Sequence, residues 1–141
     1  MTIPEIQNRI IREFGIFEDW TDKYKHIIKL GSKLAPLPDD GHIDANLVKG
    51  CQSKVWLTAT LDDDYIIFMA DSDAAITKGL VALMVRIYSG QKPDDILAHN
   101  PDFLQEIGLS EHLSPTRANG LASMVKQMKI YAMAFKSKLS L

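Results

Sequence analysis

Apolar residues in the first third of the chain recur at helical spacing. Ile6, Ile10 and Phe14 follow one another at intervals of four residues, which places them on one face of a helix. Pro4 suits the first turn of this helix, where a missing backbone N–H costs nothing. A second apolar stripe predicts a helix from about Asp19 to about Leu34. Both stripes are typical of helices that pack one face on a core.

The middle of the chain changes to a period of two. After a segment rich in Pro, Asp and Gly at residues 36–46, residues 55–60 alternate in the pattern of a strand. Three aspartates at 62–64 predict a turn into a second strand-forming run at 65–69, so the two runs should pair as an antiparallel hairpin. Leu47 and Val48 predict a short third strand beside them.

The rest of the chain reads as helical. Ser72 or Asp73 is placed to cap a helix with apolar residues on more than one side, as in a buried helix. Pro93 and Pro101 each predict the start of a short helix. Ser114 followed by proline predicts the N-cap of a long last helix, whose apolar residues continue to the end of the chain.

These elements predict an α+β fold, a small antiparallel three-stranded sheet flanked by helices. The length of 141 residues fits one domain, 1–141, which can bury a core without metal or disulfide support. With 46% apolar and 24% charged residues, the composition is that of a soluble globular protein. The 16 basic and 18 acidic residues argue against a nucleic-acid binder. No membrane span or secretory signal is predicted, so we expect a cytoplasmic protein.

The chain contains one cysteine, Cys51. A single thiol excludes an intramolecular disulfide, a dithiol redox motif and a four-cysteine zinc site. It equally excludes an iron–sulfur cluster that is held mainly by this chain's own thiolates. We therefore expect no resident metal site.

The surroundings of Cys51 allow two interpretations. A free cysteine is most often a small buried apolar residue. Here, however, it lies between Gly50 and Gln52 in a predicted loop, with Lys49 and Lys54 close in sequence. A loop thiol near cations and free backbone N–H groups should have a lowered pKa and act as a nucleophile.

Histidines offer a possible base for such a nucleophile. His26, His42, His99 and His112 are all candidates, and His42 is nearest to Cys51 in sequence, but no pattern selects one of them. A cysteine hydrolase is therefore an open alternative. A mixed metal site of Cys51, His42 and an aspartate is chemically possible, although no ligand pair at short spacing supports it.

Charge is distributed unevenly along the chain. Residues 61–75 include five acidic and no basic residues, whereas residues 114–141 include five basic and no acidic residues. The basic stretch is either an ordinary solvated helix face or a surface on which a protein partner docks, since complementary charge guides encounter.

Four segments together resemble one family, the SufE-type sulfur acceptors. Residues 50–57 (GCQSKVWL) resemble the active-site segment of the family, and residues 70–80 and 112–121 resemble its next two blocks. Residues 20–31 fit its N-terminal part. The resemblance covers almost the whole chain in the expected order, and it implies a SufE/IscU-like fold.

The resemblance implies a function in sulfur transfer. In this family the single cysteine accepts persulfide sulfur from a PLP-dependent cysteine desulfurase, stimulates that enzyme and passes the sulfur to an iron–sulfur scaffold. By this match Cys51 is the persulfide carrier, the donor is a SufS-like or CsdA-like desulfurase, and the recipient is a SufBCD-like complex. The resemblance also suggests a homodimer without a cofactor of its own, a sulfur-transfer partner rather than an enzyme.

Further residues gain expected roles from the matching blocks. Asp73 and Arg117 are expected to position the Cys51 loop or contact the desulfurase, unless Asp73 is only a helix cap and Arg117 only a surface residue. Gly50 and Gln52 are expected to shape the loop. Lys49 and Lys54 are hypothesised to stabilise the thiolate. We also expect the thiol to be shielded at rest and exposed on contact with the donor.

The CsdE-type paralogue fits these blocks equally well. The IscU-type scaffold has a similar fold but uses several cysteines, so the single thiol of this chain favours the carrier over a cluster scaffold or metal-binding module.

Overall fold

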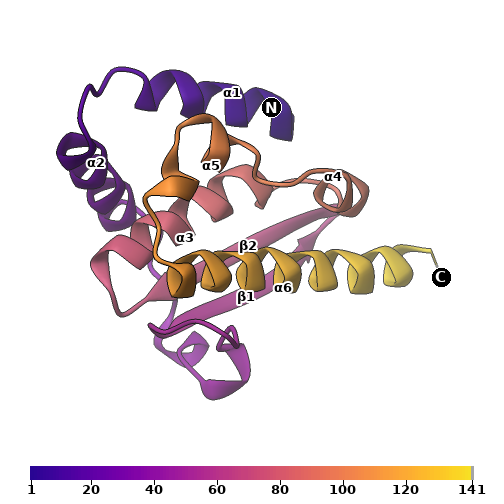
Figure 1. Ribbon diagram of the computed structural model, residues 1–141. Coiled ribbons are helices and arrows are strands. Elements are labelled where there is room, and N and C mark those ends of the chain that lie inside the picture. The colour runs from indigo at the N-terminus through magenta and orange to yellow at the C-terminus, as the bar shows by residue number, and fades with distance from the viewer. Residues whose placement is uncertain (141) are drawn as a thin grey trace.

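The computed structural model describes residues 1–140 (Figure 1). Helices α1 (Ile3–Phe14) and α2 (Trp20–Ser32) agree with the two predicted N-terminal helices. A reciprocal pair of hydrogen bonds between Thr2 and Glu5 starts α1, and the Asp19 carboxylate accepts the N–H of Asp22 at the start of α2. Such caps satisfy the backbone donors that a helix leaves free at its N-terminus.

The hairpin forms as predicted, from β1 (Val55–Asp62) and β2 (Tyr65–Ser72). Asp62 pairs with Tyr65, so the turn between the strands has two residues, and Asp63 takes a φ of 58° in it. One face of the hairpin is buried and presents Val55, Leu57, Ile66, Phe68 and Ala70 to the core. This alternation of buried and half-buried positions is the period of two seen in the sequence.

The predicted third strand is wrong, because within the described residues the sheet has two strands. Leu47 makes an isolated bridge to Trp56, and the N–H of Val48 donates to the carbonyl of Val55 at 2.8 Å. A 3-10 turn at Asp44–Asn46 precedes this contact, and Gly50 turns the chain away with a φ of +89°. Too few extended residues are left between the two to form a strand. The predicted mixed α and β fold class is confirmed.

Helix α3 (Ala75–Tyr88) is the central helix of the fold, packed against α2 and β2. Leu80, Leu83, Met84, Ile87 and Tyr88 are wholly buried, as its two-sided apolar pattern predicts. The predicted cap is wrong, because the N-cap residue is Ala74 and no side chain caps this helix. The carboxylate of Asp73 is engaged elsewhere, as described below.

Two short helices, α4 (Pro93–Ala98) and α5 (Phe103–Glu106), lead to the long helix α6 (Pro115–Leu139). Ser114 caps α6 as predicted, since its hydroxyl accepts the N–H of Arg117 at 3.2 Å. Helix α6 crosses in front of the hairpin in Figure 1, and the ring of Tyr131 packs edge-on against Phe68 of β2. A buried core links residues from all these elements. In residues 1–140, no helix has both the length and the apolar character that crossing a bilayer requires.

Candidate functional site

Cys51 lies in a loop of six residues, 49–54, that is fastened at both ends. At its start, the N–H of Val48 donates to the carbonyl of Val55 at 2.8 Å. At its end, the N–H of Lys54 donates to the carboxylate of Asp73 at 3.0 Å, and the N–H of Asp73 donates to the carbonyl of Lys54 at 3.2 Å. We call residues 49–54 the Cys51 loop. These bonds hold it beside the first turns of α6.

Two glycines allow the loop to lie directly against α6. A Cβ atom on Gly120 would stand 3.3 Å from the Sγ atom of Cys51, which is closer than ordinary van der Waals contact. A Cβ atom on Gly50 would stand 2.8 Å from the hydroxyl of Ser123, and the φ of +89° at Gly50 is itself unfavourable for other residues. Both positions therefore require glycine for the thiol to reach its observed place.

The thiol opens onto a small cavity of about 40 Å³ between the loop, α3 and α6. One water molecule needs about 10–15 Å³, so the cavity has room for an atom beyond Sγ. Its wall is partly apolar and partly polar. The lining residues are Cys51, Gln52, Ser53, Val55, Thr77, Leu80, Val81, Thr116, Arg117, Gly120, Leu121 and Met124.

The environment of Cys51 favours the neutral thiol. The side chain is partly buried, and burial raises the pKa of Cys51 above its ordinary value. The thiol also donates a weak hydrogen bond to the carbonyl of Gly120 at 3.5 Å, an acceptor that would repel a thiolate. The prediction of a lowered pKa is therefore wrong for this conformation. Neither Lys49 nor Lys54 offsets the cost of burial.

The other predicted site residues lie around the same loop. Asp73 holds the loop end through the hydrogen bond described above. Gln52 and Arg117 both line the cavity, Gln52 exposed on the loop and Arg117 half-buried in the first turn of α6. The structure thus brings Gly50, Gln52, Asp73 and Arg117 into one neighbourhood with Cys51.

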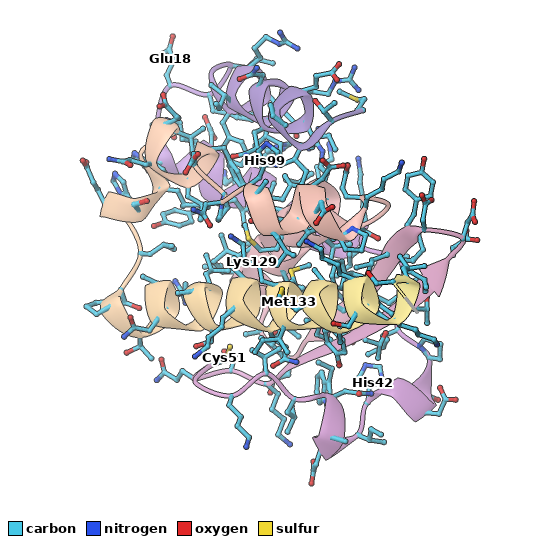
Figure 2. All side chains as sticks on the ribbon, turned by 90° about the vertical axis from the view of Figure 1, so that its right-hand side faces the viewer. Glu18, His42, Cys51, His99, Lys129 and Met133 are labelled. Atoms are coloured by element: carbon cyan, nitrogen blue, oxygen red, sulfur yellow. The ribbon has the colours of Figure 1, made fainter. Side chains whose placement is uncertain are left out.

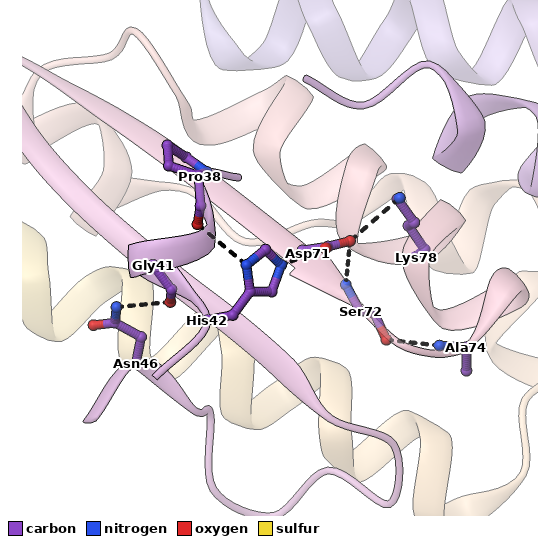
Figure 3. A network of polar contacts seen from close by, with 8 residues as sticks. All are labelled: Pro38, Gly41, His42, Asn46, Asp71, Ser72, Ala74 and Lys78. Atoms are coloured by element: carbon purple, nitrogen blue, oxygen red, sulfur yellow. Dashed lines mark hydrogen bonds and ion pairs between the residues drawn. The ribbon is translucent and has the colours of Figure 1, made fainter. Parts of the chain in front are cut away.

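His42 fixes the segment that leads into the loop (Figure 3). Its Nε2 lies 2.7 Å from an Asp71 carboxylate oxygen and its Nδ1 lies 3.1 Å from the carbonyl of Pro38. Both partners are acceptors, so the charged imidazole, which carries hydrogen on both ring nitrogens, is the form that satisfies both contacts. The hydrogen bond to Asp71 accordingly raises the pKa of His42. Lys78 reaches the second oxygen of the same carboxylate at 3.3 Å.

The remaining histidines are engaged with other partners. His26 bonds Glu13 at 2.7 Å, His99 faces the carbonyl of Asp95 at 2.8 Å, and His112 stacks on Trp20. In the described part of the chain, no histidine lines the Cys51 cavity. A cysteine hydrolase would therefore lack its base in this arrangement.

Sequence reasoning did not single out several residues of the cavity. Gly120, Thr77 and Thr116 belong to segments that resemble the family blocks, yet nothing local in the sequence marks them as neighbours of Cys51. A glycine inside an otherwise regular helix was the available signal, because it is tolerated there mainly for close packing. The side chains of residues 1–140 present no group of three His, Cys, Asp or Glu arranged to hold a metal ion.

Comparison with known proteins places this geometry in a family. The sequence model of the SufE family, described as an Fe-S metabolism associated domain, matches residues 8–132. An uncharacterised SufE-like protein of Synechocystis sp. is 38% identical over 135 residues, which cover 96% of this chain and 85% of that protein.

A solved structure supports the same fold. The solution structure of a hypothetical protein from Thermus thermophilus superposes with a TM-score of 0.79, at 18% identity, over 97% of this chain and 99% of that one. At this identity the structural similarity shows only a shared fold, whereas the family model and the Synechocystis relative show the family of this chain. The chain belongs to the SufE family, which is associated with iron–sulfur metabolism.

Proposed function

We propose that this protein, a single SufE-like domain of residues 1–141, carries sulfur on Cys51. The sulfur comes from a PLP-dependent cysteine desulfurase, SufS-like or CsdA-like, which the protein stimulates. It is then delivered to a SufBCD-like iron–sulfur scaffold in the cytoplasm. The observation that carries the proposal is one thiol, seated beside a cavity with room for a further atom, in a chain of the SufE family.

The transfer step moves one sulfur atom without net oxidation. The Cys51 thiolate attacks the terminal sulfur of the donor's cysteine persulfide, and a new S–S bond forms on Cys51. The S–S bond of the donor breaks, and its cysteine leaves as a thiolate that takes up a proton. Because the chain has one cysteine, no second thiol of its own can attack the product persulfide and release sulfide.

The resting geometry favours storage of sulfur over reaction. Burial and the Gly120 carbonyl both disfavour the thiolate, which is the reactive form. We therefore propose that contact with the donor draws the Cys51 loop out of its seat, and that the loop returns with the persulfide directed into the cavity. Asp73 and Arg117 position the loop or contact the donor during this exchange.

Mass spectrometry tests the proposal directly. After incubation with a cysteine desulfurase and L-cysteine, the parent protein should gain one sulfur atom on Cys51, and dithiothreitol should remove it. Cys51→Ser should gain none and should not accelerate the desulfurase. A matched control, Cys51→Ser with Ser53→Cys, keeps one thiol two residues further along the loop and should accelerate the enzyme less than the parent. If Cys51→Ser accelerates the enzyme as the parent does, the carrier mechanism is wrong.

Two parallel measurements address the remaining partners. Comparing the acceleration of a SufS-like and a CsdA-like enzyme identifies the donor, and sedimentation equilibrium tests the homodimer that we propose. Iron or zinc bound to the purified protein would instead favour a cluster scaffold or metal-binding module.

A further inference from the structure

Helix α6 carries apolar residues on its outer side as well as on the side that faces the core. Leu121, Met124 and Met128 are buried, whereas Ile130 is 50% and Met133 is 56% exposed. A helix at the surface of a globular protein usually keeps its outer side polar. Exposed apolar residues that gather in one place indicate a surface for binding.

The exposed apolar residues of α6 border a continuous groove. One part of it lies between α6 and the segments before it, and contains Pro101, Leu104, Leu113, Ala118, Ala122 and Val125. The next part continues along α6 to Ile130 and Met133, and shares Ala122 and Val125 with the first. We call the two parts together the α6 groove. Leu121 lines both this groove and the Cys51 cavity, so the two sites are neighbours across α6.

The rim of the α6 groove is basic. Helix α6 has five basic and no acidic residues. The ammonium group of Lys129 bonds the neutral side-chain oxygen of Asn100 at 2.6 Å, so its charge is not neutralised there, and Lys126 lies exposed on the same rim. Lys136, further along, is paired with Asp94 at 2.7 Å. A partner that fits this groove therefore carries apolar residues flanked by carboxylates.

We infer that the α6 groove is a docking surface for an acidic amphipathic helix of the cysteine desulfurase. Such a helix places apolar side chains at intervals of three and four residues into the groove, and its carboxylates lie against Lys126 and Lys129. This inference rests on the proposed function, because it takes the sulfur donor as the partner of Cys51.

The position of the groove relative to Cys51 supports the donor as its occupant. Figure 2 shows Cys51 along the lower edge of α6, Met133 on the front of that helix and Lys129 along its upper edge. The Cys51 loop alone is too small for a specific interface, which takes about 800 Å² from each partner. A donor that covers the outer side of α6 reaches the thiol and the groove in one contact.

Two pairs of substitutions test the inference, on the full chain and without L-cysteine, so that binding does not depend on sulfur transfer. Ile130→Ser with Met133→Ser removes apolar surface, and Lys126→Glu with Lys129→Glu reverses the rim charge. All four side chains lie at least partly open to solvent, so the fold should persist. Each pair should weaken the Kd for the desulfurase about tenfold or more. Added salt should weaken the parent's binding but not that of the charge-reversed pair.

Matched controls come from elsewhere on the surface. Ile16→Ser with Ile28→Ser removes exposed apolar side chains at and before α2, and Lys25→Glu with Lys29→Glu reverses two charges on that helix. Both control pairs should bind as the parent does. At saturating desulfurase, all four paired variants should still acquire one sulfur on Cys51, because none touches the cavity.

Several results would overturn the inference. The groove pairs could bind the desulfurase within twofold of the parent, or the control pairs could weaken binding as much. Alternatively, the groove pairs could convert a dimer of this chain to monomer and leave desulfurase binding unchanged, which would assign the groove to a second copy. If the parent binds through the groove but gains no sulfur, the carrier proposal fails and the docking surface stands. If the parent does not bind the enzyme, both fail.

Discussion

Two pairs of glycines bring backbone segments together in this protein, and the two contacts have different properties. The first joins α2 to α3 through Gly31 and Gly79. A Cβ on Gly31 would lie 2.7 Å from the backbone nitrogen of Gly79, and a Cβ on Gly79 would overlap the carbonyl of Ile27. Both glycines are buried and the nearest obstructing atom at each belongs to the backbone, so this contact has little freedom to adjust.

The second contact joins the Cys51 loop to α6 through Gly50 and Gly120. Here the nearest obstructing atoms are side-chain atoms, the thiol of Cys51 and the hydroxyl of Ser123, and a cavity lies alongside. These atoms can move when a neighbour changes. Glycine thus allows a rigid contact between two helices in the core and an adjustable contact between the Cys51 thiol and α6 near the surface. The four predictions below probe this difference.

The largest effect is expected at the rigid contact. Gly79→Ala forces a methyl group against the Ile27 carbonyl, and overpacking of this kind should lower the free energy of unfolding by about 3 kcal/mol. Urea unfolding measures the change. Gly15→Ala is the control, because Gly15 has a right-handed φ of −64° and a Cβ there would make only ordinary van der Waals contacts, and it should change stability by about 0.5 kcal/mol or less. Equal losses of unfolding free energy in the two variants would mean that the α2–α3 contact does not require glycine.

Asp73→Ala should loosen the contact between the Cys51 loop and the rest of the fold. It removes the acceptor of the Lys54 N–H, a bond worth about 1 kcal/mol. If this hydrogen bond stabilises the closed loop by that amount, its loss makes the open loop about fivefold more populated. Iodoacetamide should then label Cys51 about fivefold faster. Asp44→Ala, at an exposed position of the preceding segment, should leave the labelling rate unchanged. An unchanged rate in Asp73→Ala would show that Asp73 does not hold the loop.

Gly120→Ala should disturb the packing of the Cys51 thiol against α6 with little cost in stability. Alanine favours the helix by about 1 kcal/mol, and this offsets the crowding of the thiol. The new methyl group should displace Sγ towards solvent, so the pKa of Cys51, which burial raises, should fall towards its ordinary value. The pH dependence of the alkylation rate measures this pKa. Asn119→Ala, the adjacent exposed position, is the control, and the same pKa in Gly120→Ala and parent would contradict the proposed seat.

The smallest effect is expected at His42, which holds the segment before the loop. Asp71 and Asp39 both raise the pKa of His42, while Lys78 shares the Asp71 carboxylate and the Trp56 ring packs edge-on against the imidazole. Because the folded-state pKa is raised, the charged imidazole stabilises the fold fully below its ordinary pKa of 6.5. That contribution is lost as the pH rises through the folded-state value.

His42→Gln should remove this pH dependence. The parent should lose more stability than the variant when the pH is raised from about 6 to about 9, as urea unfolding at each pH would show. His99→Gln serves as the control, since His99 faces a carbonyl rather than a carboxylate. Parallel stability profiles for parent and His42→Gln would exclude a charged His42.

Local pattern predicted the elements well because each is encoded by neighbouring residues. The period of four in α1, the alternation in β1 and the Ser114 cap of α6 all recur in the structure. The prediction of a third strand was wrong because two apolar residues, Leu47 and Val48, are too short a pattern to define a strand. A 3-10 turn before them and the positive φ of Gly50 after them end the extended segment. The cap at Asp73 failed because the competing partner, the N–H of Lys54, is nineteen residues away in sequence.

The sequence by itself determined that one thiol exists, that it follows a glycine in a loop before a hairpin, and that its flanking segments resemble the SufE family. Tertiary structure decided how that thiol behaves. The lysines beside Cys51 in sequence suggested a lowered pKa, but α3 and α6 partly bury the sulfur, and this desolvation raises the pKa of Cys51. Desolvation depends on which segments pack around an atom, and Gly120, 69 residues away along the chain, makes that packing possible.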